Sequence, residues 1–381
     1  MKSKTYHLIV LTLGAVLILS PSFAIAGSFT ATGHMQFARR RHTATRLSSG
    51  KVLVAGGANS TGTLATAEVF NPATASFMRT GNMQTPRAGH TATLLGSGKV
   101  LLVGGTNASG TLATSELFNP TTGTFTRSGN MRTARVGHTA SLLANGKVLV
   151  AGGGSATAEL FDPSTGVFTP TKNMITTRMG HTATLLQNGK VLLAGGTDSN
   201  SGTALGDLFD PTTSTFSGTA TGGTQALWLS ATRLQDGRVF IAGGQVTKLI
   251  SGGSTRCCLF GPFSSALGIL FTSANNSFSA ITNMSSSRAF HSATRLGNGQ
   301  VLIAGGAKVN SFAQGSTVVT SVTPLASAEL FNPTTLSFTN TSNMTIARSW
   351  HTATIVGNGN VLITGGVDVD GNVLSTAEQY H

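Results

Sequence analysis

Residues 131–169 read MRTARVGHTASLLANGKVLVAGGGSATAELFDPSTGVFT, and this stretch predicts four short strands. The first begins at His138 and ends at Asn145-Gly146, a strong two-residue hairpin signal. The second, residues 147–153, is an apolar run stopped by glycines, as expected for a strand covered on both faces. Residues 158–161 form the third, and a turn at residues 162–166 leads into the fourth. Four antiparallel strands in a unit of this length are typical of a propeller blade.

The same pattern recurs seven times, at steps of 43 to 62 residues. Gly-Gly pairs mark the copies and begin at residues 56, 104, 152, 195, 243, 305 and 365. Fourteen residues before each pair stand His42, His90, His138, His181, Leu229, His291 and His351. Three residues before that position stand Arg39, Arg87, Arg135, Arg178, Ala226, Arg288 and Arg348. Such self-similarity predicts a repeat architecture.

The ends of the chain complement each other. The last copy stops at Tyr380, after three strands, and the missing fourth strand is predicted at Ser28-Phe29. Pairing these two segments closes the ring and removes the exposed edges of an open sheet. The sequence therefore predicts an all-β fold, a seven-bladed β-propeller over residues 27–381 whose last blade is closed by the N-terminal strand.

The repeated motifs Arg-x-x-His-Thr-Ala-Thr-Leu-Leu, Asn-Gly-Lys-Val-Leu, Gly-Gly and Ala-Glu-Leu-Phe-Asn-Pro resemble the Kelch repeat. The resemblance is to the variety found in exported bacterial Kelch proteins and in the central domain of galactose oxidase, and it covers residues 28–381. It implies the propeller fold but no single activity, because propellers host many functions. The copper chemistry of galactose oxidase relatives needs tyrosine and histidine copper ligands and a tyrosine-cysteine crosslink. The chain after residue 26 has one tyrosine, Tyr380, at a repeat core position, so that activity is not carried over.

Residues 1–26 resemble a secretory signal. Lys2 and Lys4 precede an apolar run over residues 8–19, which is too short to span a bilayer, and Ala24-Ile25-Ala26 supplies the small residues of a cleavage site. We expect cleavage near Ala26 and a secreted, periplasmic or extracellular protein without a membrane span.

Cys257 and Cys258, the only cysteines, either form a vicinal disulfide or remain two small apolar residues.

The chain is strongly basic. Removing the leader takes Lys2 and Lys4 from the 25 basic residues and leaves 23 against 12 acids, a formal charge of +11. Such a surface attracts anionic partners. Most of the charge recurs at fixed repeat positions, and Arg39-Arg40-Arg41 is the single run, so we do not expect nucleic acid as the partner.

The repeated Arg, His and acidic residues predict a structural network within each blade. Copy five loses all three together, with Ala226, Leu229 and Ile269 at their positions, and this is expected of a mutually satisfied buried set. The alternative is a metal or catalytic ring of histidines. No Ser-His-Asp set, carboxylate pair or phosphate-binding loop is recognisable, so the sequence predicts no catalytic residues, metal or cofactor.

Function is expected where the copies differ. Copies five and six carry insertions between their second and third strands, on the same face as the connections between blades. The insertion segment at residues 259–263 is apolar and is expected to be a loop that caps the mouth or contacts a partner. The residue before the histidine position varies and reads Arg41, Gly89, Gly137, Gly180, Trp228, Phe290 and Trp350.

Trp228, Phe290 and Trp350, with Arg40 and Arg41 on the neighbouring blade, predict an aromatic platform with a cationic rim at the channel mouth. The alternative is that these large residues only support the long loops. The leading hypothesis is a binding module for a carbohydrate or a protein near blades five to seven. A sugar-acting enzyme of the mutarotase type, using Arg40, Arg41, Asp368 and Asp370, is the second hypothesis, and a purely structural envelope component is the third.

Asp368-x-Asp370-x-Asn372 also has the spacing of a calcium loop, without its glycine and bidentate acid. The oligomeric state has no sequence signal.

Overall fold

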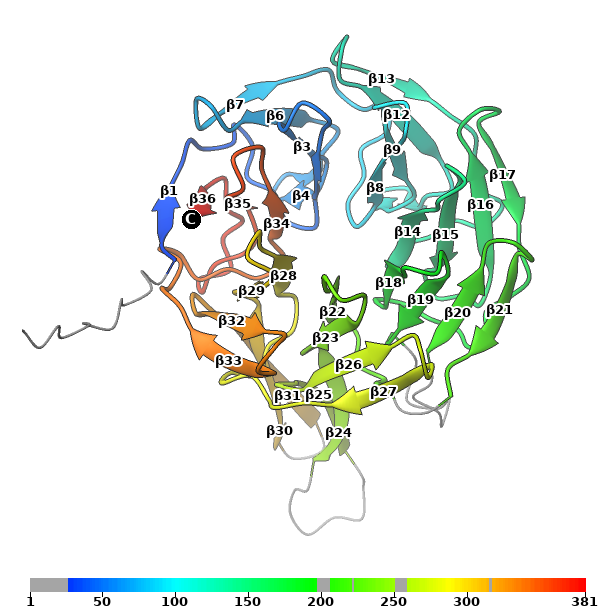
Figure 1. Ribbon diagram of the computed structural model, residues 1–381. Coiled ribbons are helices and arrows are strands. Elements are labelled where there is room, and N and C mark those ends of the chain that lie inside the picture. The colour runs from blue at the N-terminus through cyan, green and yellow to red at the C-terminus, as the bar shows by residue number, and fades with distance from the viewer. Residues whose placement is uncertain (1–26, 197–205, 221–222, 251–258, 315–316) are drawn as a thin grey trace, which may run out of the picture.

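Each repeat folds into one four-stranded antiparallel sheet, and seven such sheets form a ring in the computed structural model (Figure 1). The structure describes residues 27–196, 206–220, 223–250, 259–314 and 317–381. The predicted signal segment 1–26 and the pair Cys257 and Cys258 lie outside the described residues. In the part of the chain that the structure describes, no helical segment has the length and apolar character that crossing a membrane requires.

The strands of each blade run from the channel outward. Blade one contains β2 (Thr43–Arg46), β3 (Val52–Ala55), β6 (Ala67–Asn71) and β7 (Ser76–Arg79), and blade two contains β8 (Thr91–Leu94), β9 (Val100–Val103), β12 (Ser115–Asn119) and β13 (Thr124–Arg127). Blade three contains β14 (His138–Leu142), β15 (Val148–Gly152), β16 (Ala158–Asp162) and β17 (Val167–Pro170), and blade four contains β18 (Thr182–Leu185), β19 (Val191–Ala194), β20 (Asp207–Asp210) and β21 (Thr215–Gly218). Blade five contains β22 (Ser230–Arg233), β23 (Val239–Ala242), β26 (Gly268–Thr272) and β27 (Ser277–Ala280), and blade six contains β28 (Ser292–Arg295), β29 (Val301–Ala304), β32 (Ala328–Asn332) and β33 (Ser337–Asn340).

Blade seven joins the two ends of the chain, as predicted. Its strands are β34 (Thr352–Ile355), β35 (Val361–Thr364), β36 (Ala377–Tyr380) and, outermost, β1 (Phe29–Ala31). Phe29 pairs with Tyr380 in the antiparallel register, and their rings pack 4.9 Å apart. The innermost strands each contact two neighbours, so the ring is continuous around the channel.

The hydrophobic core lies between blades. In β3, Val52 and Val54 pack toward blade seven, whereas Leu53 and Ala55 pack toward blade two. All four are buried, which explains why the second strand of each blade reads as an unbroken apolar run. Each pair of neighbouring blades shares one such cluster, which makes seven in all.

Short hairpins join the second and third strands of some blades. They are β4 (Ala58–Asn59) with β5 (Gly62–Thr63), β10 (Thr106–Asn107) with β11 (Gly110–Thr111), β24 (Gln245–Ile250) with β25 (Leu259–Ser264), and β30 (Ala307–Gln314) with β31 (Thr317–Pro324). The last two come from the insertions in blades five and six. Residues 259–263, expected to be a loop, therefore belong to a strand, because they pair along their length with β24.

A buried arginine fixes the connection into six of the seven blades. In blade one, Arg39 donates to the carbonyl oxygens of Gly56 at 2.7 Å and Thr66 at 3.0 Å, and to Glu68 Oε1 at 2.8 Å. Glu68 also accepts the backbone N–H of Gln36 at 2.8 Å. The corresponding pairs are Arg87–Glu116, Arg135–Glu159, Arg178–Asp207, Arg288–Glu329 and Arg348–Glu378, all with side chains at most 2% exposed. The prediction of an Arg-acid network within the blade is confirmed for the six blades that carry these residues.

The histidine belongs to a different contact, and its assignment to the network within the blade is wrong. His90 Nε2 of blade two lies 2.9 Å from the Thr43 hydroxyl of blade one, so the imidazole joins neighbouring blades. The corresponding pairs are His42–Thr352, His138–Thr91, His181–Thr139, His291–Ser230 and His351–Ser292. Leu229 stands in this place in blade five, and Thr182 opposite it donates instead to the Ala194 carbonyl of its own blade.

Removing one partner of the ion pair tests the network. Glu159→Ile leaves the Arg135 guanidinium buried without its carboxylate, and we expect a loss of about 3–5 kcal/mol of unfolding free energy. The triple variant Arg135→Ala/His138→Leu/Glu159→Ile copies the residues of blade five and should lose much less. Urea unfolding followed by circular dichroism measures both. A triple variant no more stable than the single one would contradict the view that the set is replaceable only as a whole.

The buried imidazoles predict acid sensitivity. Burial, followed by the charge of Arg135, lowers the pKa of His138 to about 3, and burial likewise lowers the pKa of His181, His291 and His351 to about 3. Between pH 6.5 and about 3 the unfolded chain therefore binds more protons than the folded one, and stability falls with the pH. Each such histidine contributes about 1.4 kcal/mol per pH unit. Unfolding free energies measured between about pH 7 and 4 should show a shallower pH dependence for His138→Leu than for the parent chain, and equal slopes would refute this.

Candidate functional site

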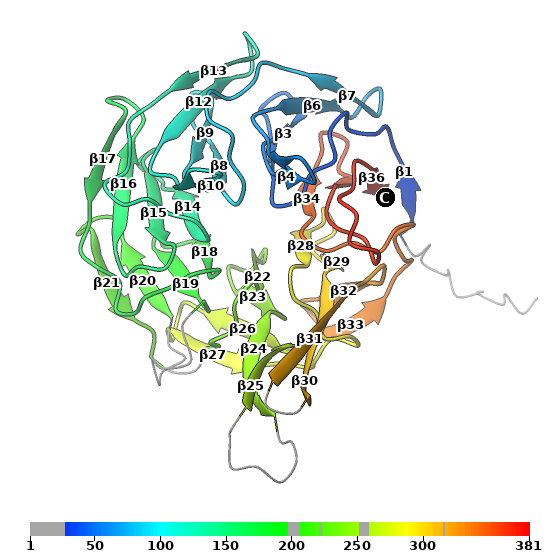
Figure 2. The same cartoon turned by 180° about the vertical axis from the view of Figure 1, so that it is seen from behind.

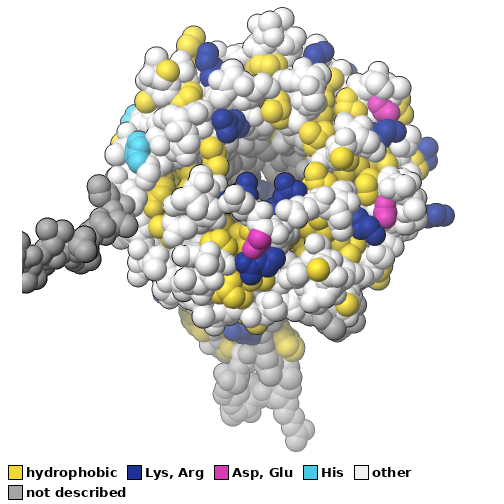
Figure 3. Space-filling view, viewed as in Figure 1, with side chains coloured by type: hydrophobic (Ala, Val, Ile, Leu, Met, Phe, Trp, Pro, Cys, Tyr) yellow, Lys and Arg dark blue, Asp and Glu magenta, His cyan; other side chains and the backbone are white. Residues whose placement is uncertain are grey.

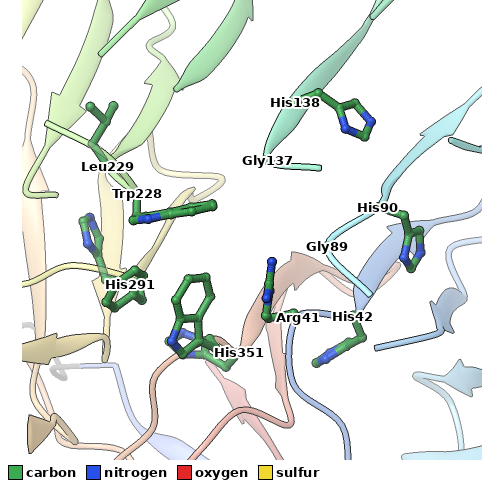
Figure 4. Close-up of a pocket in the computed structure, with 12 residues that line it drawn as sticks. Arg41, His42, Gly89, His90, Gly137, His138, Trp228, Leu229, His291 and His351 are labelled. Carbon is green, nitrogen blue, oxygen red and sulfur yellow. The ribbon is translucent and has the colours of Figure 1, made fainter. Parts of the chain in front are cut away.

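A cavity of about 280 Å³ opens at one mouth of the central channel. Every lining residue belongs to the histidine position of a blade or to the residue immediately before it. Figure 4 shows Trp228 and Arg41 extending toward the middle of the ring, with His90 and His138 lying further out. The structure therefore brings together side chains from blades that are far apart in the sequence.

The residue before the histidine position has a left-handed backbone in all seven blades. Three of these residues are glycines, with φ of 63 to 67°, and the other four are large side chains in the same conformation. The values are 54° for Arg41, 57° for Trp228, 58° for Phe290 and 58° for Trp350. A left-handed backbone costs a non-glycine residue about 1–2 kcal/mol. The other left-handed non-glycine residues, Ala75, Ser214, Asn276 and Leu336, lie in the turns between third and fourth strands.

Six backbone hydrogen bonds link these seven residues in a series around the mouth, from Gly89 at one end to Gly137 at the other. Gly89 donates to the Arg41 carbonyl at 2.9 Å, and Arg41 donates to the Trp350 carbonyl at 3.3 Å. The series continues from Trp350 to Phe290, from Phe290 to Trp228, from Trp228 to Gly180 and from Gly180 to Gly137, at 2.8 to 3.3 Å. Glycine and the large residues make the same backbone hydrogen bonds at the same φ, so this backbone geometry does not depend on which side chain a blade carries.

The three aromatic side chains contact one another. Phe290 and Trp350 stack at 4.0 Å between ring centroids, and Trp228 meets the Trp350 ring edge-on at 5.2 Å. The Arg41 guanidinium lies 5.6 Å from the Trp350 ring centroid, at cation-π distance. All four side chains are half-buried.

The glycines of blades two to four make room for these side chains. A Cβ atom on Gly180 would lie 3.0 Å from the Trp228 indole, and one on Gly137 would lie 3.4 Å from the far edge of the same ring. A Cβ on Gly89 would lie 3.0 Å from an Arg41 guanidinium nitrogen. The large and the small residues of the ring are thus complementary.

Arg41 is the one formally charged residue among the described residues that line the cavity. Burial of the imidazoles keeps them neutral, since it lowers their pKa far below the usual range. Burial, and then the neighbouring charge of Arg40, lowers the pKa of Arg41, but a guanidinium stays protonated in proteins. The cavity is therefore apolar and aromatic with a single positive charge.

Other residues singled out in the sequence lie elsewhere. Arg40 is exposed, its backbone pairs with Ala58, and it is not among the lining residues. Asp368 accepts the backbone N–H groups of Asp370 and Asn372 and the Asn372 side-chain amide, so its carboxylate stabilises a turn. Neither Asp368 nor Asp370 lines the cavity.

The two insertion hairpins leave the mouth open. The views in Figures 1 and 2 agree that β24–β25 and β30–β31 extend beyond the outer rim of the ring, so they do not cover the central opening as expected for a cap. The hairpins pack on each other, with the Ser311 hydroxyl donating to the Pro262 carbonyl at 2.7 Å. Phe260 and Phe312 are more than half exposed on them.

Larger grooves occur at equivalent places between several pairs of neighbouring blades. One of about 910 Å³ lies between blades one and two, and others of about 490 and 620 Å³ lie between blades six and seven and between blades five and six. Each is formed by the first-to-second-strand turns of neighbouring blades. Because several blade pairs have one, these grooves follow from blade packing, and the mouth cavity is the better candidate.

Sequence reasoning located the aromatic residues but missed the backbone that holds them. Glycines at the equivalent positions of blades two to four were the available signal, because glycine is the usual residue where φ is positive. Those glycines also indicated the space into which Trp228 and Arg41 extend.

Comparison with known proteins shows the fold alone. No family model and no curated protein matches the chain. Among solved structures, the chain is similar to a fungal alcohol oxidase of the AA5 family that is described in complex with copper. The TM-score is 0.72 and the sequence identity is 18%. The match covers 93% of this chain and 76% of the oxidase. The chain therefore has a seven-bladed propeller fold that resembles the galactose oxidase family fold.

The residues do not fit a copper centre. Tyr380 lies in β36 with its hydroxyl 2.9 Å from the Thr341 hydroxyl, is 3% exposed, and is not among the cavity residues. Among the described residues, no group of three or more His, Cys, Asp or Glu side chains is arranged to hold a metal ion.

The fit between Gly180 and Trp228 is testable because the chain has only two tryptophans, both in this cavity. Gly180→Ala should cost about 1–2 kcal/mol for its left-handed backbone and should also displace the Trp228 ring, which shifts the tryptophan emission. Gly189→Ala is the matched control, because Gly189 has φ of 81° and open space around it. Equal emission spectra in the two variants would mean that Trp228 does not lie against Gly180.

Proposed function

We propose that this protein is a binding module of the Kelch-repeat type that holds a carbohydrate ring at the channel mouth near blades five to seven. The observation that supports this most is the left-handed backbone of Trp228, Phe290, Trp350 and Arg41. The same backbone takes glycine without strain in three other blades. Strained residues that persist in a cluster are typical of functional sites.

The composition of the cavity suits a sugar. Ligand sites combine apolar and aromatic walls with a few polar groups that fix orientation. Trp228 and the stacked pair Phe290 and Trp350 supply apolar surface, and Arg41 supplies hydrogen-bond donors. The volume of about 280 Å³ is near the lower end of the range for ligand pockets, which suits a single ring.

The other hypotheses have less support. Acid-base chemistry on sugars normally uses carboxylates, and the described residues that line the cavity include none. Asp368, which the enzyme hypothesis needs, is occupied in its own turn. A purely structural role does not require large side chains where glycine would relieve strain.

The predicted leader is consistent with this role. Export would bring the mature chain, from residue 27 onward, to the periplasm or the cell exterior, where polysaccharides are available. This placement remains a prediction from the sequence and belongs to the same proposal.

Binding to an array of glycans, followed by titration of intrinsic tryptophan fluorescence, tests the proposal. Trp350→Gly and Trp228→Gly should each weaken binding at least tenfold, because each removes a wall of the cavity while leaving a residue that suits the backbone. Leu336→Gly is the control, since Leu336 is also left-handed, with φ of 55°, but lies in an outer turn. Binding that survives both tryptophan variants would refute the site, and a blank array would favour a protein partner.

A further inference from the structure

Arg41 differs from the other arginines near the channel axis in its contacts. The six arginines of the blade network each donate to a buried carboxylate of their own blade. Among the described residues, none offers a carboxylate or another hydrogen-bond acceptor to the Arg41 guanidinium. The guanidinium lies instead over the face of Trp350, with its central carbon 5.6 Å from the ring centroid.

The position of the guanidinium is nevertheless defined. One nitrogen lies over Gly89, and the stacked pair Trp350 and Phe290 lies on its other side. Arg41 is half-buried, and Arg40 adds a second positive charge nearby. A guanidinium has five donors in a planar fork, and partial burial removes part of the water that would otherwise accept from them.

Arg41 is the one charged residue among the described residues that line the cavity, and Arg40 lies beside it in the chain without lining it. The lining histidines are neutral at physiological pH, because burial lowers their pKa, and no carboxylate lines the cavity among the described residues. The innermost strands, which surround the channel, also carry no acidic residue. An anionic group in the cavity would therefore meet the charge of Arg41, with that of Arg40 nearby, and no opposing charge among the described lining residues.

We infer that the ring held at the mouth carries a carboxylate, as in a uronic acid, and that Arg41 is the residue that selects it. This inference rests on the proposed carbohydrate function. A single guanidinium matches a singly charged planar carboxylate, with two parallel N–H···O bonds, and the aromatic walls contact the ring beside it. A sulfate or phosphate group would be expected to have more than one cation lining its cavity, and Arg40 does not line this one.

The opposite mouth provides a control within the same chain. Figure 3 shows that face, where Lys and Arg side chains lie around the central opening. Arg46 ends β2 there, is exposed, and occupies the position of Leu94 in blade two. Arg46→Gln therefore removes the same charge from the channel surroundings without altering the aromatic cavity.

The experiment compares a galacturonate disaccharide with its methyl ester, which keeps the ring and removes the charge, on the full chain at neutral pH. We expect the acid to bind about tenfold more tightly than the ester, as a charge-assisted pair would give. In Arg41→Gly the preference should fall to about one, and Arg41→Lys should keep part of it. Glycine occupies this position in blades two to four, so the Arg41→Gly backbone is not strained. Arg46→Gln should keep the full preference.

The other outcomes are distinguishable. Equal binding of acid and ester, lost in Trp350→Gly, would overturn the role of Arg41 and leave the proposed function intact. An acid preference that persists in Arg41→Gly would also overturn it. Tighter binding of a matched sulfated disaccharide would overturn the carboxylate assignment. Failure of every charged and neutral sugar to bind would end both proposals.

Discussion

The buried guanidinium at the entry to six of the seven blades determines where the mouth residues of those blades lie. In blade one, Arg39 donates hydrogen bonds to Glu68 and to two carbonyl oxygens of its own blade. Three residues later, the His42 imidazole forms a hydrogen bond with Thr352 of blade seven. Arg41 lies between these two anchors, so its left-handed backbone is imposed from both sides. Strained conformations persist only where the surroundings over-determine them, and this arrangement satisfies that condition.

Blade five shows how much of this constraint can be replaced. Ala226, Leu229 and Ile269 are all buried, and a Leu229 methyl group lies against Gly195 where other blades place an imidazole. Trp228 still has φ of 57°, held by its hydrogen bond to Gly180 and by the pairing of Leu227 with Gln245. The ring of neighbouring blades can therefore maintain the mouth when one blade exchanges its polar network for apolar packing, because the ring is closed.

The architecture could be predicted in detail from the sequence because the same packing positions recur in each copy of the repeat. The strand order, the closure by Phe29 and Tyr380, and the Arg-acid pairs all follow from positions that recur. The histidine contact did not follow, since spacing within one copy cannot show that His90 reaches across to Thr43. The strand β25 was also missed, because its pairing partner lies within the same insertion and has no counterpart in other copies. The site was located through the variable position, but its geometry depends on which glycines face which large side chains, and this is a property of the closed ring.

The same reasoning explains why fold similarity says little about chemistry here. At 18% identity, the AA5 oxidase shares the arrangement of blades with this chain, and the residues at the mouth are free to differ because the backbone around it is set elsewhere. In this chain the packing between blades also buries the imidazoles, and burial lowers the pKa of four of them to about 3. These imidazoles are therefore uncharged at neutral pH. The ring of histidines therefore contributes no charge to the mouth at neutral pH. Arg41, the one charged residue among the described residues that line the cavity, can then determine which ligand the aromatic cavity accepts.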